Sequence, residues 1–368
     1  MKILVITQQY PRKNDLYRNM FVHTRLNAYR HSGENLHFQV FVLNGHSEHY
    51  SFEGINVICG GNDDLRCEIK ESKYQKIVVH FLTYGMVGPL LREAQLIPKI
   101  IWVHGYEALS WKRRIFNATS PLFLRYVLAN EIQLFSFRKF VRRAKNAHFV
   151  FVSNWMKNVA EVDTTSQFKC YSIIPNGIDT EVYSYKRKDA SKRFRVLMIR
   201  PFNSRKYATD VAVRAIEKLS KSSYFSKFSF TIVGEGKYHS KDIRKVSHYK
   251  NVSIINRFIG KREICKLHNQ NGVFLCPTRQ DAQGVSMCEA MSSGLVPISS
   301  KNTAIPEFIE NGVDGFLTND TDEIVEAMIK IADSPELFQE ISQSASERIR
   351  STCSLEITTR RELSLIMK

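Results

Sequence analysis

The sequence feature that most constrains the fold is a series of short apolar, β-rich runs separated by segments with helical periodicity. Lys2–Thr7 is the first run, at the very start of the chain. A continuous apolar run of this length is typical of a strand buried in a parallel sheet. Similar runs recur at residues 39–43, 76–80, 99–103 and 147–153. This alternation predicts βαβ units built around a parallel sheet.

A second series of the same kind begins at Arg195–Ile199 and continues at residues 229–233, 252–255, 272–276 and 295–299. The stretch between the two series contains Pro-Asn-Gly and several charges but no apolar period, which is typical of a linker region. The length of 368 residues also favours two cores, because single cores stop growing at about 250–300 residues.

We therefore expect an α/β protein with a Rossmann-like first domain over residues 1–175, a linker region over 176–193 and a Rossmann-like second domain over 194–353. The sequence leaves open to which half the last helix, about residues 354–368, belongs, and packing back on the first domain is one alternative.

The charge balance points to an anionic partner. Lys and Arg number 53 against 36 Asp and Glu, a net charge of +17. Such an excess favours nucleic acid, phosphorylated small molecules or an anionic membrane surface, and the charge alone does not choose among them.

Cysteine usage and hydropathy indicate the compartment. The seven cysteines are dispersed without a C-x-x-C pair, which predicts reduced thiols rather than a disulfide framework or a zinc site. No run reaches the roughly 20 apolar residues of a membrane span, and the first residues do not form a signal peptide. We expect a cytoplasmic protein, either free or peripheral on the inner face of the membrane.

The loops that follow the strands of the second domain carry candidate binding residues, because ligands of open parallel sheets bind beyond the carboxyl ends of the strands. Arg200 follows the strand ending at Ile199 directly, and Lys206 comes six residues later. A guanidinium fork and an ammonium in one loop suit a diphosphate. The alternative is a solvated basic loop.

A second such loop leads into a predicted helix. Gly284 permits close approach of the backbone, and Ser286 predicts a helix N-cap with the helix starting at about Met287. The free amides of a helix start form an anion site. Glu289 would fall in the first turn, where its carboxylate can accept hydrogen bonds from a ribose diol. The Ser286-x-x-Glu289 spacing equally fits a capping box, and both interpretations stay open.

Two common nucleotide-binding motifs are missing from the sequence. Gly234-Glu235-Gly236 follows a predicted strand, but His239 occupies the position of the third glycine of a dinucleotide fingerprint. The sequence G-x-x-x-x-G-K-[ST] does not occur. A nicotinamide or flavin site and a P-loop are therefore disfavoured.

Taken together, these motifs resemble a known family. Asp281 to Gly294 is similar to the acidic-x7-Glu signature of the retaining glycosyltransferases of family 4, which have the GT-B fold. Further stretches agree in order: Val103-His104-Gly105, Ser153 to Lys157, Pro175 to Asp179, Arg200 to Lys206, Gly234 to Gly236 and Ile305 to Phe316. The resemblance implies two Rossmann-like, doubly wound parallel-sheet domains that face each other across a cleft, with the nucleotide sugar bound by the second.

The resemblance implies transfer of a sugar, with retention, from a UDP- or GDP-sugar to a hydroxyl acceptor, without a metal or a bound cofactor. It assigns the diphosphate to Arg200 and Lys206, and the ribose to Glu289. It assigns the hydroxyls of the transferred sugar to Asp281, the phosphate or sugar to the amides of Gly284, Val285 and Ser286, and a place near the reacting carbon to His104. By itself, His104 could also be a core histidine.

The chain departs from the family pattern at two places. The family usually has Glu at the first acidic position, where this chain has Asp281, whose side chain is one methylene shorter. A Gly-Gly loop usually follows the first strand, where this chain reads Asn14 to Phe21. Arg18 in that region would serve either the acceptor or a phosphate.

Residues 108–146 form a basic segment of the first domain. They contain nine Lys or Arg and one acid, interleaved with aromatic and aliphatic residues. A helical stretch of this kind can lie on an anionic membrane surface, where it would present a glycan or lipid-linked acceptor. The alternative is a pair of helices that simply cover the first sheet.

Two other classes of function compete with glycosyl transfer. A nucleotide-sugar epimerase or hydrolase of the same scaffold would turn over the donor without an acceptor. A basic nucleic-acid-binding protein would bind RNA or DNA in a salt-sensitive way, but the sequence carries no recognised nucleic-acid motif, and we expect no nucleic-acid partner.

Overall fold

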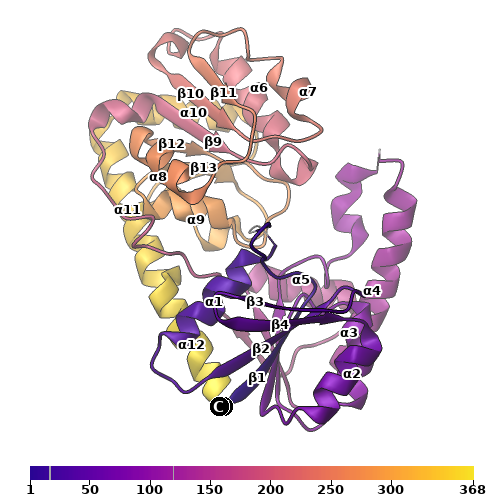
Figure 1. Cartoon of the computed structure of the whole chain (residues 1–368). Coiled ribbons are helices and arrows are strands. Elements are labelled where there is room, and N and C mark those ends of the chain that lie inside the picture. Colours follow the sequence, from indigo (N-terminus) through magenta and orange to yellow (C-terminus); the bar gives the residue numbers. More distant parts are fainter. Residues whose placement is uncertain (16–17, 119) are drawn as a thin grey trace. The chain divides into compact units, whose positions relative to one another are not determined.

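The computed structural model describes residues 1–15, 18–118 and 120–368, which form two units (Figure 1). Unit 1 consists of Met1–Pro175 and Thr359–Lys368, and unit 2 consists of Asn176–Thr358. Residues 176–193, which we expected to be a linker region, are part of unit 2. Asn176 exchanges hydrogen bonds with the side chain of Gln283, and the buried Lys188 donates to the carbonyl of His268 at 2.7 Å.

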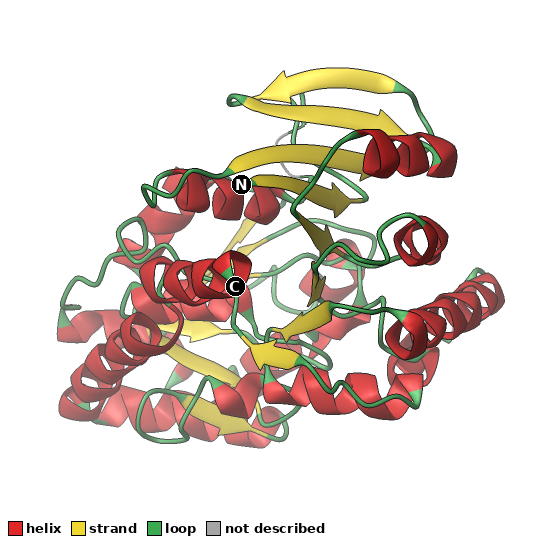
Figure 2. Cartoon of the chain, turned by 90° about the horizontal axis from the view of Figure 1, so that it is seen from below, coloured by secondary structure: helices red, strands yellow, loops and turns green. Residues whose placement is uncertain are grey.

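The sheet of unit 1 has eight strands in the order β3-β4-β2-β1-β5-β6-β7-β8. All neighbours are parallel except β3, which pairs antiparallel with β4 at one edge (Figure 2). The strands are β1 (Lys2–Thr7), β2 (His37–Leu43), β3 (Glu48–Phe52), β4 (Ile55–Gly60), β5 (Lys76–His80), β6 (Lys99–Val103), β7 (Ala147–Phe151) and β8 (Tyr171–Ile173).

Helices connect these strands: α1 (Met20–Arg30), α2 (Asn62–Glu71), α3 (Tyr84–Arg92), the 3-10 helix η1 (Trp111–Asn117), α4 (Phe123–Arg143) and α5 (Asn154–Thr164). Their apolar faces pack on the sheet. Ile3 and Val5 of β1, for example, share one buried cluster with Val22 and Leu26 of α1. The central strands are apolar on both faces because helices cover both.

The sheet of unit 2 has six parallel strands in the order β11-β10-β9-β12-β13-β14. They are β9 (Arg195–Ile199), β10 (Ser229–Val233), β11 (Val252–Ile255), β12 (Val273–Leu275), β13 (Val296–Ser300) and β14 (Phe316–Thr318). The order reverses direction between β9 and β12. At such a switch point the loops leaving the two strands diverge to opposite faces, and ligands bind in the opening.

The helical elements of unit 2 are η2 (Ala190–Phe194), η3 (Arg205–Tyr207), α6 (Thr209–Leu219), η4 (Phe225–Lys227), α7 (His239–Ile243), α8 (Lys261–Gln270), α9 (Val285–Ser292), η5 (Ile305–Glu307), α10 (Thr321–Asp333) and α11 (Pro335–Cys353). The last helix, α12 (Leu355–Met367), belongs to unit 1 from Thr359 onward. There Glu362 forms a buried ion pair with Arg25, and the carbonyl of Ile366 accepts a hydrogen bond from Lys76.

The expected fold class is confirmed as an α/β fold with two parallel sheets. Each run that we read as a strand is one, with ends that differ by at most two residues. Four strands were not predicted: β3, β4, β8 and β14. They are short or lie toward the sheet edges, and β3 (Glu-His-Tyr-Ser-Phe) has no apolar run to mark it. The facing of the two domains across a cleft stays a prediction.

Candidate functional site

The switch point of unit 2 brings together the loops that carry Arg200 and Asp281. Arg200 leaves the end of β9 and is buried, with 4% of its surface exposed. Its Nη2 donates to the carbonyl of Cys276 at 3.3 Å, and its Nη1 lies 4.0 Å from Oδ2 of Asp281. Its Nε is buried without an acceptor in the described residues. An unpaired buried N–H is costly, so this guanidinium retains capacity for one more acceptor.

Asp281 organises the start of helix α9. Its Oδ1 accepts hydrogen bonds from the amides of Gly284 at 2.9 Å and Gln283 at 3.3 Å. The loop is thereby turned into the helix, and only Oδ2 is left to face Arg200. The shorter side chain of Asp suits this local role, because two neighbouring amides lie within its reach.

Helix α9 starts two residues earlier than we predicted. Its first residue is Val285 and its N-cap is Gly284, whose φ of 82° lies in the left-handed region that glycine adopts without strain. The prediction of Ser286 as N-cap is therefore wrong, since the Asp281 carboxylate already caps the loop. In the described part of the chain, the amides of Val285 and Ser286 have no acceptor. They are the unsatisfied donors that make a helix start attractive to anions.

Glu289 occupies the fifth position of α9, in its second turn, so our placement in the first turn was also wrong. The helix has no side-chain cap, which excludes the capping box. Burial raises the pKa of Glu289 to about 7, although a hydrogen bond with Tyr183 and the charge of Lys261 act to lower it. No hydrogen bond or ion pair among the described residues joins Glu289 to Arg200 or Lys206 directly.

Lys206 is held through its backbone, and its ammonium group makes no ion pair with a carboxylate in the described part of the chain. Its carbonyl accepts hydrogen bonds from the amide of Arg279 at 2.8 Å and from Oγ1 of Thr278 at 3.0 Å. Its Nζ lies 4.6 Å from the centre of the Tyr207 ring. The loop after β12 thus fixes the loop after β9 where the lysine projects.

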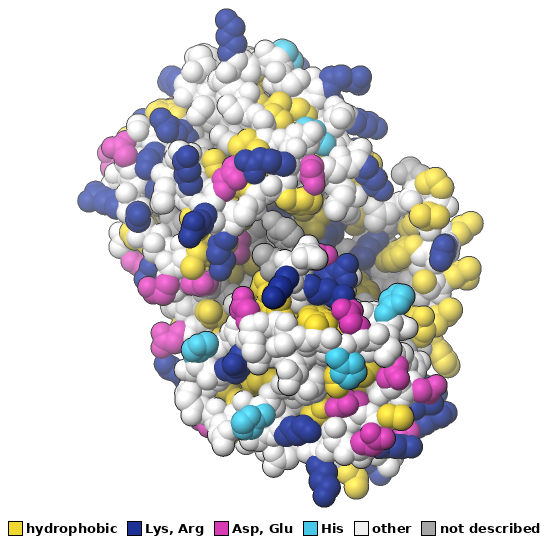
Figure 3. All heavy atoms as spheres, in the orientation of Figure 1, with side chains coloured by type: hydrophobic (Ala, Val, Ile, Leu, Met, Phe, Trp, Pro, Cys, Tyr) yellow, Lys and Arg dark blue, Asp and Glu magenta, His cyan; other side chains and the backbone are white. Residues whose placement is uncertain are grey.

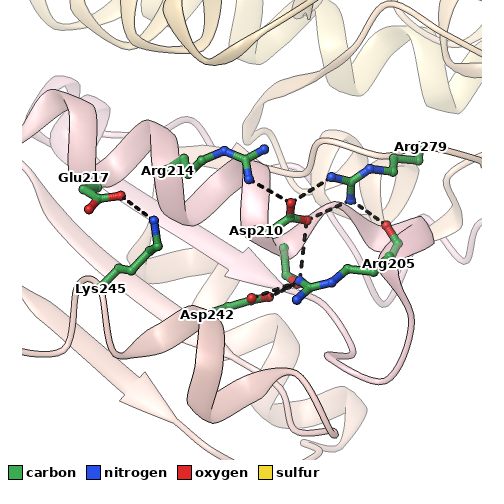
Figure 4. A network of polar contacts seen from close by, with 8 residues as sticks. Arg205, Asp210, Arg214, Glu217, Asp242, Lys245 and Arg279 are labelled. Atoms are coloured by element: carbon green, nitrogen blue, oxygen red, sulfur yellow. Dashed lines mark hydrogen bonds and ion pairs between the residues drawn. The ribbon is translucent and has the colours of Figure 1, made fainter. Parts of the chain in front are cut away.

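A network of ion pairs locks these two loops together (Figure 4). The guanidinium of Arg279 bonds both oxygens of Asp210 at 2.8 Å and the carbonyl of Arg205 at 2.8 Å. Arg205 in turn bonds Asp242. Burial acts to raise the pKa of Asp210, but the bonds and charges of Arg279, Arg214 and Arg205 outweigh it and lower that pKa to about 2. Asp210 is thus ionised at neutral pH, and its charge holds together the ion-pair network that joins the two loops.

The Gly234-Glu235-Gly236 turn has a packing role. A Cβ at Gly234 would lie 2.0 Å from the carbonyl of Arg200, and a Cβ at Gly236 would lie 2.5 Å from the amide of Asn203. Both glycines have a φ near 140°. The turn therefore presses directly on the loop that starts with Arg200, and a side chain at either place would displace that loop.

In unit 1, His104 follows β6 in a tightly held loop. Glu107 accepts hydrogen bonds from the amides of His104 at 2.6 Å and Gly105 at 3.0 Å. Burial raises the pKa of Glu107 to about 7, and these backbone bonds oppose the rise. Gln133 of α4 adds a bond to the carbonyl of Glu107 at 3.1 Å.

The side chain of His104 lies in an aromatic environment. The rings of Phe81 and Phe21 are 4.4 Å and 5.0 Å from it, and its Nε2 lies 3.0 Å from Nδ1 of His80. Burial and the nearby charge of Arg25 hold the pKa of His104 well below its usual range. The imidazole is therefore neutral at physiological pH, and its partner is another side chain rather than the backbone.

Arg18 is paired with a neighbour. Its Nε lies 2.6 Å from Oδ2 of Asp15. Leu16 and Tyr17, within the region that departs from the family pattern, lie outside the described residues.

The basic segment forms η1 and α4. One face of α4 is buried through Leu134, Phe137 and Phe140, and it packs against α3 and α5. The opposite face exposes an apolar stripe whose members are between 56% and 78% accessible, namely Leu124, Leu128, Ile132 and Phe135. Figure 3 shows hydrophobic side chains gathered over this part of unit 1. We call these four residues the α4 stripe.

A groove of about 300 Å³ continues the α4 stripe toward the end of the helix. It is lined by Phe135, Arg138, Lys139, Arg142 and Arg143. Arg138 is held by the carbonyl of Thr164 at 2.8 Å. Covering the sheet accounts for the buried face of α4 and leaves the exposed stripe and its cations unexplained.

Sequence reasoning missed four residues of these sites: His80, Tyr183, Asp210 and Arg279. His80 could have been found, because it is a polar residue at the carboxyl end of a predicted strand, where ligands of parallel sheets bind. Arg279 lies inside the loop that we singled out, but its partner Asp210 lies 69 residues away on α6, and no local pattern joins them.

The described residues contain no group of three or more His, Cys, Asp or Glu side chains arranged to hold a metal ion. In the same part of the chain, no helix combines the length and apolarity needed to cross a membrane.

Comparison with known proteins finds a family match within unit 2. Residues 193–334, most of unit 2, match the family model of glycosyl transferases group 1. An uncharacterized glycosyltransferase of Methanocaldococcus jannaschii is 23% identical over 72% of this chain and 66% of its own length. A probable sucrose-phosphate synthase of Thermosipho melanesiensis is 23% identical over 81% of this chain and 71% of its own length.

The Escherichia coli UDP-Gal:alpha-D-GlcNAc-diphosphoundecaprenol alpha-1,3-galactosyltransferase is 21% identical over 72% of this chain and 68% of its own length.

Solved structures share the fold. Sucrose-phosphate synthase from Thermosynechococcus elongatus superposes with a TM-score of 0.77 at 13% identity, covering 100% of this chain and 98% of its own. The Anabaena protein HepE in complex with UDP gives 0.73 at 14% identity, with both chains fully covered.

The fold and the comparisons define the class as a glycosyltransferase of the GT-B type. Within that class, residues 193–334 of unit 2 match the model of glycosyl transferases group 1, in agreement with the resemblance noted in the sequence.

Proposed function

We propose that this protein transfers a sugar from a nucleotide-diphosphate sugar, UDP- or GDP-linked, to a hydroxyl of a glycan or lipid-linked acceptor, with retention and without a metal. The observation that carries the proposal is the convergence at the switch point of unit 2. There, an orphaned N–H of Arg200 and two free amides at the start of α9 are linked through one carboxylate, Asp281. Fixed donors and positive charge of this kind stabilise a departing diphosphate.

Each residue has a distinct proposed role. Arg200 and Lys206 bind the donor diphosphate, and the amides of Val285 and Ser286 bind a phosphate or sugar oxygen, with Gly284 allowing the approach. Asp281 orients Arg200 and offers its Oδ2 to the transferred sugar. Glu289, supported by Tyr183, binds the ribose diol.

His104 contacts the sugar near the reacting carbon in this proposal. Its aromatic surroundings keep it neutral, so it can exchange hydrogen bonds with sugar hydroxyls without adding a charge. The departing diphosphate itself takes the acceptor proton.

The test of the proposed function is a donor screen with Lys206→Ala as the diagnostic variant. A charge-assisted contact is worth about 1.5–3 kcal/mol, so kcat/KM should fall roughly 10- to 100-fold. Lys227→Ala is the matched control, because Lys227 also lies over a nearby tyrosine ring, 4.7 Å from that of Tyr224, but beside the start of β10. Near-normal turnover in Lys206→Ala would refute its role. Donor consumption without any acceptor would favour an epimerase or hydrolase.

We propose further that the α4 stripe and the adjacent cationic groove dock on the anionic inner face of a membrane, where a lipid-linked acceptor would be presented. The feature that supports this is amphipathic: four exposed apolar side chains adjoin four cations on one helix. Apolar insertion and attraction to anionic lipid act together on such a face.

Co-sedimentation with vesicles tests the docking. The wild type should bind vesicles that contain anionic phosphatidylglycerol at low salt and be released by high salt. The exposed substitutions Leu128→Ser and Phe135→Ser together should abolish binding, whereas Leu96→Ser, which changes an 81% exposed leucine elsewhere in unit 1, should not. Failure of the wild type to bind at low salt would end the proposal.

A further inference from the structure

The two histidines at the carboxyl ends of β5 and β6 form a pair that the function described so far uses only in part. We propose that His80 is a positioning residue: it holds Nε2 of His104 in a hydrogen bond, fixes one neutral tautomer of that ring, and leaves Nδ1 as the nitrogen that meets the transferred sugar. This inference rests on the proposed function only in that His104 contacts the transferred sugar. The hydrogen bond itself is independent of it.

The geometry defines the pair. Nδ1 of His80 lies 3.0 Å from Nε2 of His104, and the ring planes are inclined by 23°. A hydrogen bond between two imidazole nitrogens needs one N–H and one lone pair, so at least one of the two rings must be neutral. Because a neutral ring carries one N–H, whichever atom donates here decides whether Nδ1 of His104 is an acceptor or a donor.

The surroundings keep both rings uncharged. His80 is 1% exposed and lies against Trp102, while Phe21 and Phe81 cover His104. Beyond burial, the charge of the Arg25 guanidinium acts on both rings and lowers the pKa of each. Glu362 pairs with Arg25, and no described carboxylate bonds either imidazole.

The backbone directly after His80 is held in an uncommon conformation. Phe81 follows His80 directly and has a φ of 60°, which a bulky non-glycine residue rarely adopts. Its ring stacks on Tyr106 and contacts His104. Such strain persists only where the surroundings over-determine it, and it concentrates at functional sites. Here it places a ring against His104 from the strand that supplies His80.

These constraints leave one nitrogen for chemistry. Nε2 of His104 is engaged, and in the described residues Nδ1 has no hydrogen-bond partner. A ring whose tautomer is fixed offers the same donor or acceptor to every substrate molecule, and this preorganisation needs no adjustment during reaction. A freely exchanging ring would present the wrong tautomer for part of the time.

The first experiment reads the tautomer directly. Imidazole ¹⁵N shifts of His104 should show one neutral tautomer in the wild-type chain and an averaged mixture in His80→Phe, which keeps a ring but has no nitrogen. His80→Asn, whose amide can reach the position of Nδ1, should restore a single tautomer. His148→Phe, which removes a histidine bonded to Ser172 near the amino end of the neighbouring strand β7, should leave His104 unchanged. A single tautomer that persists in His80→Phe overturns the proposal.

The second experiment reads catalysis. His80→Phe should lower kcat about tenfold with donor KM changed less than twofold, and His80→Asn should recover most of kcat. Thermal unfolding of each variant identifies any that fail to fold. If His80→Phe fails to fold, the kcat of His80→Asn is compared with that of the wild type instead. Unchanged kcat in a folded His80→Phe overturns the positioning role. If the wild type transfers no sugar, the proposed function fails, whereas the ¹⁵N shifts still decide whether His80 fixes His104.

Discussion

The buried ion pair between Arg25 and Glu362 gives a quantitative prediction for the helix α12. Nε of Arg25 lies 3.0 Å from Oε1 of Glu362, and the Tyr29 hydroxyl donates to Oε2 at 2.5 Å. The two charged side chains are only 5% and 2% exposed. Glu362→Gln keeps the size of the side chain but removes the carboxylate charge that faces the buried guanidinium. Breaking a buried pair in this way costs about 3–5 kcal/mol.

Thermal and urea unfolding measure this loss. For a domain of this size each kcal/mol shifts the midpoint by about 2–4 °C, so Glu362→Gln should lower the Tm of unit 1 by roughly 6–20 °C. Glu34→Gln, an exposed carboxylate of the same unit, should lower it by less than about 2 °C.

A compensating variant separates burial of charge from loss of packing. Arg25→Met, Tyr29→Phe and Glu362→Leu together replace the polar group by apolar side chains of similar size, and buried pairs replaced in this way are often as stable as the original. We expect the triple variant to regain most of the lost stability. A Glu362→Gln protein within about 1 kcal/mol of wild type would refute the reasoning, as would a triple variant no more stable than the single one.

Two more predictions follow from unit 2. Asp210→Asn should weaken the bond to Arg279 that fixes Lys206 and lower kcat/KM for the donor about tenfold at unchanged secondary structure. The control is Asp63→Asn, which changes an exposed partner of Arg66. Equal activity of the two variants would contradict the role of the Asp210–Arg279 ion pair in fixing Lys206. Burial raises the pKa of Glu289 from 4.5 to about 7, so ionisation of its carboxyl group opposes folding. As the pH rises from 4.5 to above 7, the free energy of unfolding of the wild type should therefore fall by on the order of 3 kcal/mol relative to that of Glu289→Gln. Denaturant titrations of both proteins at pH 5 and pH 8 measure this loss. An unfolding free energy that changes equally with pH in both proteins would disprove the raised pKa of Glu289.

The alternation of strands and helices was readable because it is a local property. A run such as Lys76–His80 is apolar at successive positions because helices cover both faces of its strand, and the chain shows this without its neighbours. Arg200 could be placed at the end of a strand for the same reason. The order of strands in a doubly wound sheet then fixes which loops lie at the switch point.

Tertiary structure decided what each of these side chains touches. Asp281 sits in a recognisable sequence, yet its bonds to the Gly284 and Gln283 amides depend on the turn and moved the helix start to Val285. His80 and His104 lie 24 residues apart on neighbouring strands, and Asp210 and Arg279 lie 69 apart. Periodicity records only which residues are buried together with their near neighbours along the chain. Pairs formed across the sheet follow from strand order and packing, and these exist only once the chain has folded.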